Sequence, residues 1–189
     1  NDLRLAVFDA LLQCAETLSS ENEQEARALY ERILDKAAAE RIRIAAYAGI
    51  IRTAGEDAPP LAETALQSKN PALWAASLPA VRDAGSGIAT HALARLVGHV
   101  HRDVLPGLVE ALAQRGDPIA APAIAQLVDD ADPALRAIAI HTLATLGDSA
   151  AVPALVRAAA HGGKSDSADA TDALARLPAP DATDALLAQ

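Results

Sequence analysis

Aromatic residues are scarce in this sequence: one Trp, two Tyr and one Phe make up 2% of its 189 residues. Runs of alternating β-branched residues, which predict strands, are absent at the length that a strand requires. The hydrophobic fraction is nevertheless 51% and consists mainly of Ala, Leu, Ile and Val, side chains that suit close packing of helices. The composition therefore predicts an all-α protein.

Clustered positive charge is missing as well. Sixteen Lys and Arg stand against 25 Asp and Glu, the net charge is −9, and the basic residues are scattered along the chain. Phosphate backbones and anionic lipid surfaces both attract concentrated positive charge, so we expect no binding to nucleic acid or to a membrane surface. No apolar run approaches the length of a membrane span, so we expect no membrane insertion.

The sequence has a single cysteine, Cys14, and no methionine. One cysteine cannot form an internal disulfide, and it leaves the cellular compartment open. Cys14 lies at helical spacing from Val7, Leu11 and Leu18, so we expect it to be a small buried hydrophobe. With no initiator Met and a helical pattern from the outset, the chain is interpreted as a segment of a larger bacterial protein, extracytoplasmic if the parent is a secreted enzyme.

Four columns of residues recur at one fixed offset of 31 positions. A period of this length is typical of a solenoid, in which each unit buries its apolar face against the next. The first column is aliphatic throughout, and the others are small or aliphatic. The columns are Ile50, Val81, Leu112, Leu143 and Leu174; Ala54, Gly85, Gly116 and Gly147; Ala62, Leu93, Ile124 and Leu155; and Leu66, Val97, Val128 and Ala159.

One repeat is clearest between Asp132 and Gly162. Asp132 is a good N-cap, and the proline that follows it suits the first helical position, where its missing N–H is not needed. A buried stripe through Leu143 follows, and Gly147 ends the helix because glycine adopts positive φ most easily. A tight turn then leads into a second, antiparallel helix. The chain as a whole is expected to contain about six such antiparallel helix pairs.

The predicted division places an N-terminal helical hairpin at residues 1–37 and one continuous solenoid at residues 38–189. The second helix of this hairpin resembles that of a tetratricopeptide unit. The hairpin is expected to cap the N-terminal end of the stack. The solenoid is divided at the period into five repeats, at approximately 39–69, 70–100, 101–131, 132–162 and 163–189.

The run Asp132-Pro133-Ala134-Leu135-Arg136-Ala137-Ile138-Ala139, continued to Val152-Pro153-Ala154-Leu155, resembles the HEAT repeat. More narrowly, it is similar to the short HEAT-like repeat of phycobilin lyase subunits. The resemblance is strong over residues 132–160, good over 101–131, recognisable from 39 to 98 and faint after Gly163. It implies a right-handed α-α superhelix that binds other macromolecules along a curved surface.

The same resemblance implies a basic residue near the start of each first helix. Arg43 and Arg136 match this position, whereas Trp74 and Leu105 depart from it. We therefore expect a ladder of polar contacts between repeats to be interrupted in the middle of the array. Trp74 is expected to be half-buried between repeats, and because tryptophan is enriched in binding hot spots it is also a candidate contact residue.

A column of polar residues offers a second candidate for partner binding. Thr64, Arg95, Gln126 and Arg157 follow one another at the period on the second helices, and we call them the second-helix stripe. In HEAT arrays the second helices line the concave surface, so these side chains are expected to face a partner there. An ordinary solvated ladder without a ligand has the same spacing.

Signs of catalysis are absent from the sequence. No Ser, Cys or Thr lies in a nucleophile motif, and no glycine-rich phosphate loop is present. The five histidines do not form the His-Glu pairs that HEAT-type metalloenzymes use, so we expect no metal site and no cofactor. The sequence is interpreted as a monomeric, non-catalytic scaffold or spacer that binds a protein, a peptide or other domains of its parent chain. The alternative is a tetrapyrrole-handling subunit of phycobilin lyase type, although aromatic residues to line its groove are few.

Overall fold

The computed structural model of the chain describes residues 2–83, 87–147 and 149–177. Within these ranges every regular element is a helix, which confirms the all-α prediction. No described helix combines the length and the hydropathy needed to cross a bilayer. The chain divides into two compact units, residues 1–93 and 94–189.

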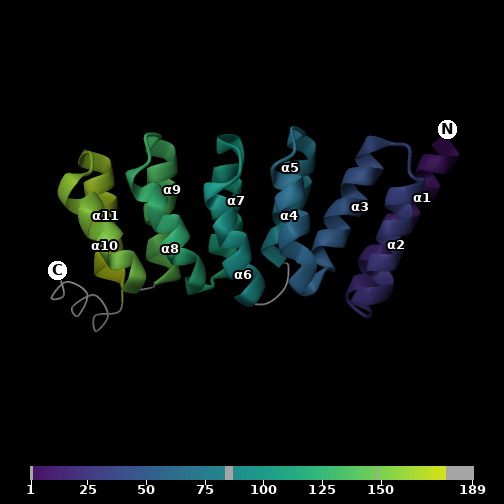
Figure 1. Cartoon of the computed structure of the whole chain (residues 1–189), viewed down its shortest axis with the longest axis horizontal. Coiled ribbons are helices and arrows are strands. Elements are labelled where there is room, and N and C mark those ends of the chain that lie inside the picture. The colour runs from purple at the N-terminus through teal and green to yellow at the C-terminus, as the bar shows by residue number, and fades with distance from the viewer. Residues whose placement is uncertain (1, 84–86, 148, 178–189) are drawn as a thin grey trace. The chain divides into compact units, whose positions relative to one another are not determined.

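Unit 1 consists of helices that pack on their neighbours in sequence (Figure 1). Helix α2 packs on both α1 and α3, and α3 also packs on α4 and α5. The hairpin predicted at residues 1–37 therefore packs directly on the first predicted repeat. The elements are α1 (Asp2–Ser19), α2 (Glu23–Lys36), α3 (Glu40–Arg52), the 3₁₀ helix η1 (Gly55–Asp57), α4 (Ala58–Leu66), α5 (Pro71–Asp83) and α6 (Gly87–Ala94), whose last residue begins unit 2.

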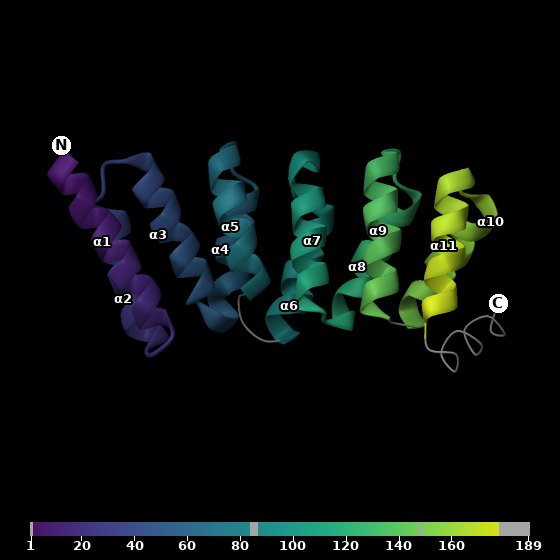
Figure 2. The same ribbon diagram turned by 180° about the vertical axis from the view of Figure 1, so that it is seen from behind.

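In unit 2 the first helices of three repeats, α7 (Leu105–Arg115), α9 (Pro133–Leu146) and α11 (Lys164–Arg176), lie side by side (Figure 2). The second helices are shorter and partly 3₁₀, which differs from the single continuous helix predicted for each. The remaining elements are η2 (Arg95–Gly98), η3 (Arg102–Val104), η4 (Pro118–Ala120), α8 (Ala121–Ile124), η5 (Ala125–Asp129), η6 (Ser149–Ala151) and α10 (Val152–His161).

The aliphatic columns form the core, as the period predicted. Val81, Leu112 and Leu143 in the first column are completely buried, and Ile50 is nearly so. All four members of the third column, from Ala62 to Leu155, are also completely buried. The column ends are looser, because Leu174 and Ala159 are only partly buried. A residue every 31 positions thus marks the interior of each repeat.

Two glycines of the second column lie at the C-terminal ends of first helices. Gly116 and Gly147 are the C-caps of α7 and α9, and both have φ of 67°, a left-handed conformation that glycine adopts with little strain. The earlier member Ala54 does not share this role, because the positive φ in its repeat falls one residue later, at Gly55. Gly85 and the part of the last predicted repeat after residue 177 lie outside the described residues.

Neighbouring repeats are also tied by polar side chains about one period apart. In unit 1 Arg41 forms two hydrogen bonds with Asp9, at 2.8 and 3.0 Å. In unit 2 Arg102 binds Asp130, at 2.6 and 3.2 Å. Hydrogen bonds from Arg102 and from the backbone N–H of Asp132 hold the pKa of Asp130 below its ordinary value. The stabilisation from this tie is therefore present above about pH 4 and is lost as acid protonates the carboxylate.

The prediction that Cys14 is buried was wrong, because its side chain is exposed. Helix α1 packs against α2 and α3 through the face that carries Phe8, Leu11 and Ala15. Cys14 lies at the flank of this face, on a side of the helix that also carries Val7, which is 51% exposed. The helix is apolar on both faces, so the spacing alone did not show which face is covered.

Candidate functional site

The second-helix stripe is exposed at all four of its positions. Thr64 in α4 uses its hydroxyl to donate to the backbone carbonyl of Pro60, at 2.9 Å. In unit 2 Arg157 is held by Asp129, with its closer guanidinium nitrogen 3.1 Å from the carboxylate. Among the described residues, Arg95 and Gln126 have no hydrogen bond or ion pair from their side chains. The stripe stays a prediction, with Arg95 and Gln126 as its members open to a partner.

Trp74 is half-buried, as predicted, and it takes over a contact that arginine makes elsewhere. Its indole N–H donates to the carbonyl of Ser68, in the turn before its own helix, at 2.7 Å. Arg43 donates in the same way to the carbonyl of Leu34, at 3.1 Å, and Arg136 to that of Asp130, at 2.9 Å. An indole N–H and a guanidinium N–H can each satisfy a carbonyl just before the helix, so Trp74 keeps this one contact of the basic residue. The interruption of polar contacts between repeats at Trp74 and Leu105 stays a prediction.

We expect Trp74→Phe to lower the free energy of unfolding by about 0.5–1.5 kcal/mol, because the ring remains while the bond to Ser68 is lost. Urea denaturation followed by circular dichroism would measure this change. Trp74→Arg, which restores an N–H donor of the kind used at Arg43, should be more stable than Trp74→Ala. Equal stability of the Arg and Ala variants would contradict the assigned role.

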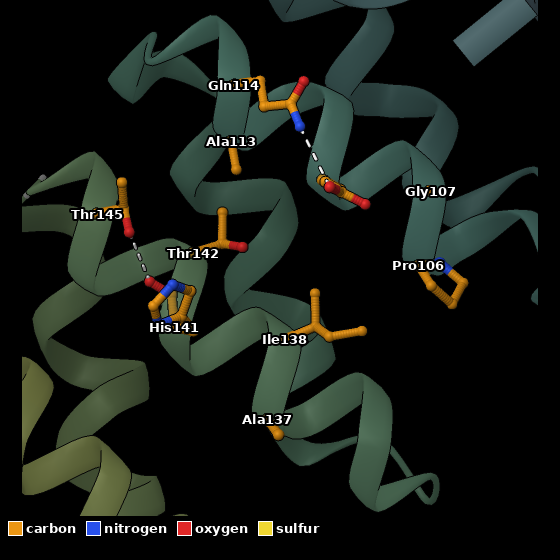
Figure 3. Close-up of a pocket in the computed structure, with 10 residues that line it drawn as sticks. Pro106, Gly107, Ala113, Gln114, Ala137, Ile138, His141, Thr142 and Thr145 are labelled. Carbon is orange, nitrogen blue, oxygen red and sulfur yellow. Dashed lines mark hydrogen bonds between the residues drawn. The ribbon is translucent and has the colours of Figure 1, made fainter. Parts of the chain in front are cut away.

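A groove lies between the first helices α7 and α9, on a face that the sequence analysis did not single out (Figure 3). Its volume is about 710 Å³. We call it the first-helix groove, and its lining residues are Pro106, Gly107, Glu110, Ala113, Gln114, Ala137, Ile138, His141, Thr142 and Thr145.

Small side chains create this groove. Gly107 and Ala113 on α7 and Ala137 on α9 leave space that larger residues would fill between two adjacent helices. Ile138 adds a partly buried aliphatic surface. The lining is therefore mostly apolar, with polar groups at a few points, which is the usual character of a binding groove.

The polar groups of the groove are partly engaged with one another. The Gln114 amide donates to a carboxylate oxygen of Glu110, at 3.2 Å, and the Thr145 hydroxyl donates to the carbonyl of His141, at 3.0 Å (Figure 3). Thr142 differs from them. The residue is 3% exposed, its hydroxyl has no hydrogen bond among the described residues, and its oxygen is not among the fully buried polar atoms.

A second, smaller hollow of about 340 Å³ lies between α9 and α11. Ala137 and His141 line both hollows, so the two meet over the exposed face of α9. On the α11 side the lining is charged. Asp172 pairs with Arg176 at 2.5 Å, whereas Asp169 accepts only a long hydrogen bond of 3.4 Å from Ser165.

A signal for the groove was present in the sequence. Residues that line the groove and the second hollow follow one another at the same offset of 31, with Gly107 followed by Ile138 and then Asp169, and Glu110 followed by His141 and then Asp172. These positions change chemistry at every step, so a search for like residues at the period passes over them. The positions to compare were therefore those on the exposed side of the first helices, whatever their residue types.

Comparisons with known proteins agree with this architecture. The family model of the HEAT repeats matches residues 89–175 and 124–189, which together span more than half of the chain. A search among curated proteins found no match. Among solved structures, computationally designed armadillo repeat proteins for modular peptide recognition are similar with a TM-score of 0.53 and 18% identity, over 94% of each chain. The chain therefore belongs to the HEAT repeat family and has the helical repeat fold that HEAT and armadillo proteins share.

Proposed function

We propose that this chain is a non-catalytic interaction module that binds a segment of a partner protein, and that the first-helix groove of unit 2 is its binding surface. The observation that carries the proposal is the groove itself, an apolar hollow between α7 and α9 whose lining includes the Thr142 hydroxyl, to which no described residue hydrogen-bonds. The armadillo repeat proteins that share the fold were designed for modular peptide recognition, which supports a peptide as the occupant. Its place as a scaffold or spacer in a larger bacterial protein stays a prediction.

Selection from a displayed library of random peptides tests this proposal. Ala137 is exposed and lines both hollows, so the large side chain of Ala137→Trp should fill them. The difference in helix propensity should change the stability of the helix by only about a few tenths of a kcal/mol. We expect peptides selected on the native chain to bind this variant at least about tenfold more weakly, a loss of about 1.4 kcal/mol.

The matched control is Ala168→Trp, the same change one repeat further along at an exposed position of α11 that lines neither hollow. This variant should bind the selected peptides normally. Peptides that tolerate Ala137→Trp but are lost with Arg95→Ala would contradict the groove and place the binding surface on the second-helix stripe.

The tetrapyrrole-handling alternative stays a prediction that no contact in unit 2 favours. Neither hollow beside α9 has a Phe, Tyr or Trp among its lining residues. A planar conjugated ligand is usually held by aromatic and polar side chains, and the polar side chains that line the two hollows are one histidine, two threonines, one arginine and a few acidic or amide groups. A peptide with small side chains matches this lining better.

A further inference from the structure

The Thr142 hydroxyl is the most informative group in the first-helix groove. The residue is 3% exposed and lines the groove, so the little surface that it exposes opens there. Figure 3 shows the hydroxyl pointing from α9 toward the space beside α7. No described residue hydrogen-bonds to it, and it is not among the fully buried polar atoms that lack a partner, so its oxygen stays open to the groove. A ligand with a free N–H or C=O at this point would hydrogen-bond to it in place of water.

The free hydrogen-bonding group points to an extended occupant. A helix uses its backbone N–H and C=O groups internally, whereas a polyproline II segment leaves all of them available. An extended segment laid across α7 and α9 can therefore offer a backbone group to Thr142 while its side chains enter the hollows. Small side chains on the groove walls, such as Gly107 and Ala113, let a backbone approach closely.

Charge indicates what the side chains of the occupant should be. Glu110 lines the first hollow and Asp169 the second, and neither carboxylate pairs with a cation among the described residues. Each carboxylate accepts only a neutral hydrogen bond, from Gln114 and Ser165 respectively. The chain carries a net charge of −9. A Lys or Arg side chain entering each hollow would therefore meet an uncompensated carboxylate.

The spacing of the hollows sets the spacing of these cations. Packed helices lie about 8–10 Å apart, so the centres of the two hollows on either side of α9 are separated by about that distance. Glu110 and Asp169 stand on the outer walls, on α7 and α11, where the flexible stem of a Lys or Arg entering each hollow can reach them. A polyproline II helix has three residues per turn and rises about 3.1 Å per residue, so side chains three residues apart point the same way and lie about 9 Å apart. The distance between these side chains therefore matches the distance between the centres of the two hollows.

We propose that the hollows beside α9 bind an extended, polyproline II-like segment with two basic residues three positions apart and small apolar residues between them. This rests on the proposed function and specifies its ligand. Glu110 and Asp169 bind the two cations, and the Thr142 hydroxyl, which lines the first hollow, binds a backbone group of the segment there.

Three synthetic peptides test the proposal by NMR titration of the ¹⁵N-labelled chain at low salt. The probe is Gly-Ala-Pro-Lys-Ala-Pro-Lys-Ala-Pro-Gly. One twin replaces both lysines with glutamates, and the other, Gly-Ala-Pro-Lys-Pro-Lys-Ala-Ala-Pro-Gly, places the lysines two positions apart. We expect the probe to shift amides of α7, α9 and α11. The acidic twin should not bind, and the respaced twin should bind roughly fivefold more weakly than the probe, the loss of one exposed ion pair.

Variants assign the contacts. Glu110→Gln and Asp169→Asn should each weaken binding of the probe by about two- to fivefold, as expected for an exposed ion pair. Thr142→Val should weaken it about two- to tenfold, as expected for one hydrogen bond, without lowering the melting temperature, because the hydroxyl has no partner in the free chain. Glu21→Gln is the control, since this exposed carboxylate lies in unit 1, outside both hollows, and should leave the affinity unchanged.

Equal binding of the probe and the respaced twin, or shifts spread over both units, would overturn the proposed ligand. If Thr142→Val lowered the melting temperature as well as the affinity for the probe, the hydroxyl would have a structural role, and this result would also contradict the proposed ligand. Failure of the proposed function is seen separately. Library peptides that bind the groove without paired basic residues, and whose affinity is unchanged by Glu110→Gln, would overturn only the proposed ligand class. Library peptides whose affinity is unchanged by Ala137→Trp would overturn the groove as the binding surface.

Discussion

Leu143→Ala is expected to lower the free energy of unfolding by about 2–5 kcal/mol, as for other leucines removed from well-packed cores. Leu143 is completely buried in α9, which packs against α7, α11 and η5. The truncation leaves a cavity in the core, and a helix held by neighbours on several sides cannot collapse far to fill it. Urea denaturation followed by circular dichroism would measure the loss.

The matched control is Leu3→Ala, because Leu3 is 80% exposed in α1 and its truncation should change stability by less than about 0.5 kcal/mol. Hydrogen exchange adds a second readout. In a linear array each repeat touches only its neighbours, so Leu143→Ala should speed exchange in unit 2, around residues 101–177, and spare the hairpin of α1 and α2. Equal acceleration in α1 and α2 would contradict the linear-array description.

The period predicted the core well because burial in a repeat protein depends on position within the unit. Leu112 and Leu143 occupy equivalent positions one repeat apart, and both are completely buried. The helix ends followed from local chemistry in the same way. Asp132 accepts a hydrogen bond from the Ala134 N–H at the start of α9, and Gly147 ends that helix with a positive φ. These features depend on a few adjacent residues, so the sequence could show them.

Features that depend on a neighbouring repeat were harder to predict. Cys14 was expected to be buried because α1 is apolar around much of its circumference, and only the packing of α2 and α3 shows which face is covered. The bond from Trp74 to Ser68 could not be foreseen, because it depends on the path of the turn before α5. The first-helix groove was missed for a third reason. It arises where side chains are small, and the residues that line it differ in chemical type from one repeat to the next.

Arg136 makes the most buried polar tie between repeats in unit 2. Its guanidinium binds the Asp166 carboxylate of the next repeat at 2.7 Å and donates to the backbone carbonyls of Asp130 and Ala131, at 2.9 and 3.2 Å. The Asp166 side chain is only 8% exposed. Removing the guanidinium would leave a buried carboxylate and two turn carbonyls without their partner. We expect Arg136→Ala to lower the free energy of unfolding by about 2–4 kcal/mol.

Arg157→Ala is the matched control, since Arg157 also pairs with an aspartate about one repeat away, but both side chains of that pair are more than half exposed. An exposed pair contributes at most about 1 kcal/mol, so the two arginines should differ clearly. The double variant Arg136→Met with Asp166→Leu should recover much of the loss, because it removes the stranded carboxylate together with its partner and replaces both with apolar groups. If Arg136→Ala cost no more than Arg157→Ala, burial of the pair would not be what stabilises this junction, and the aliphatic columns alone would hold the two repeats together.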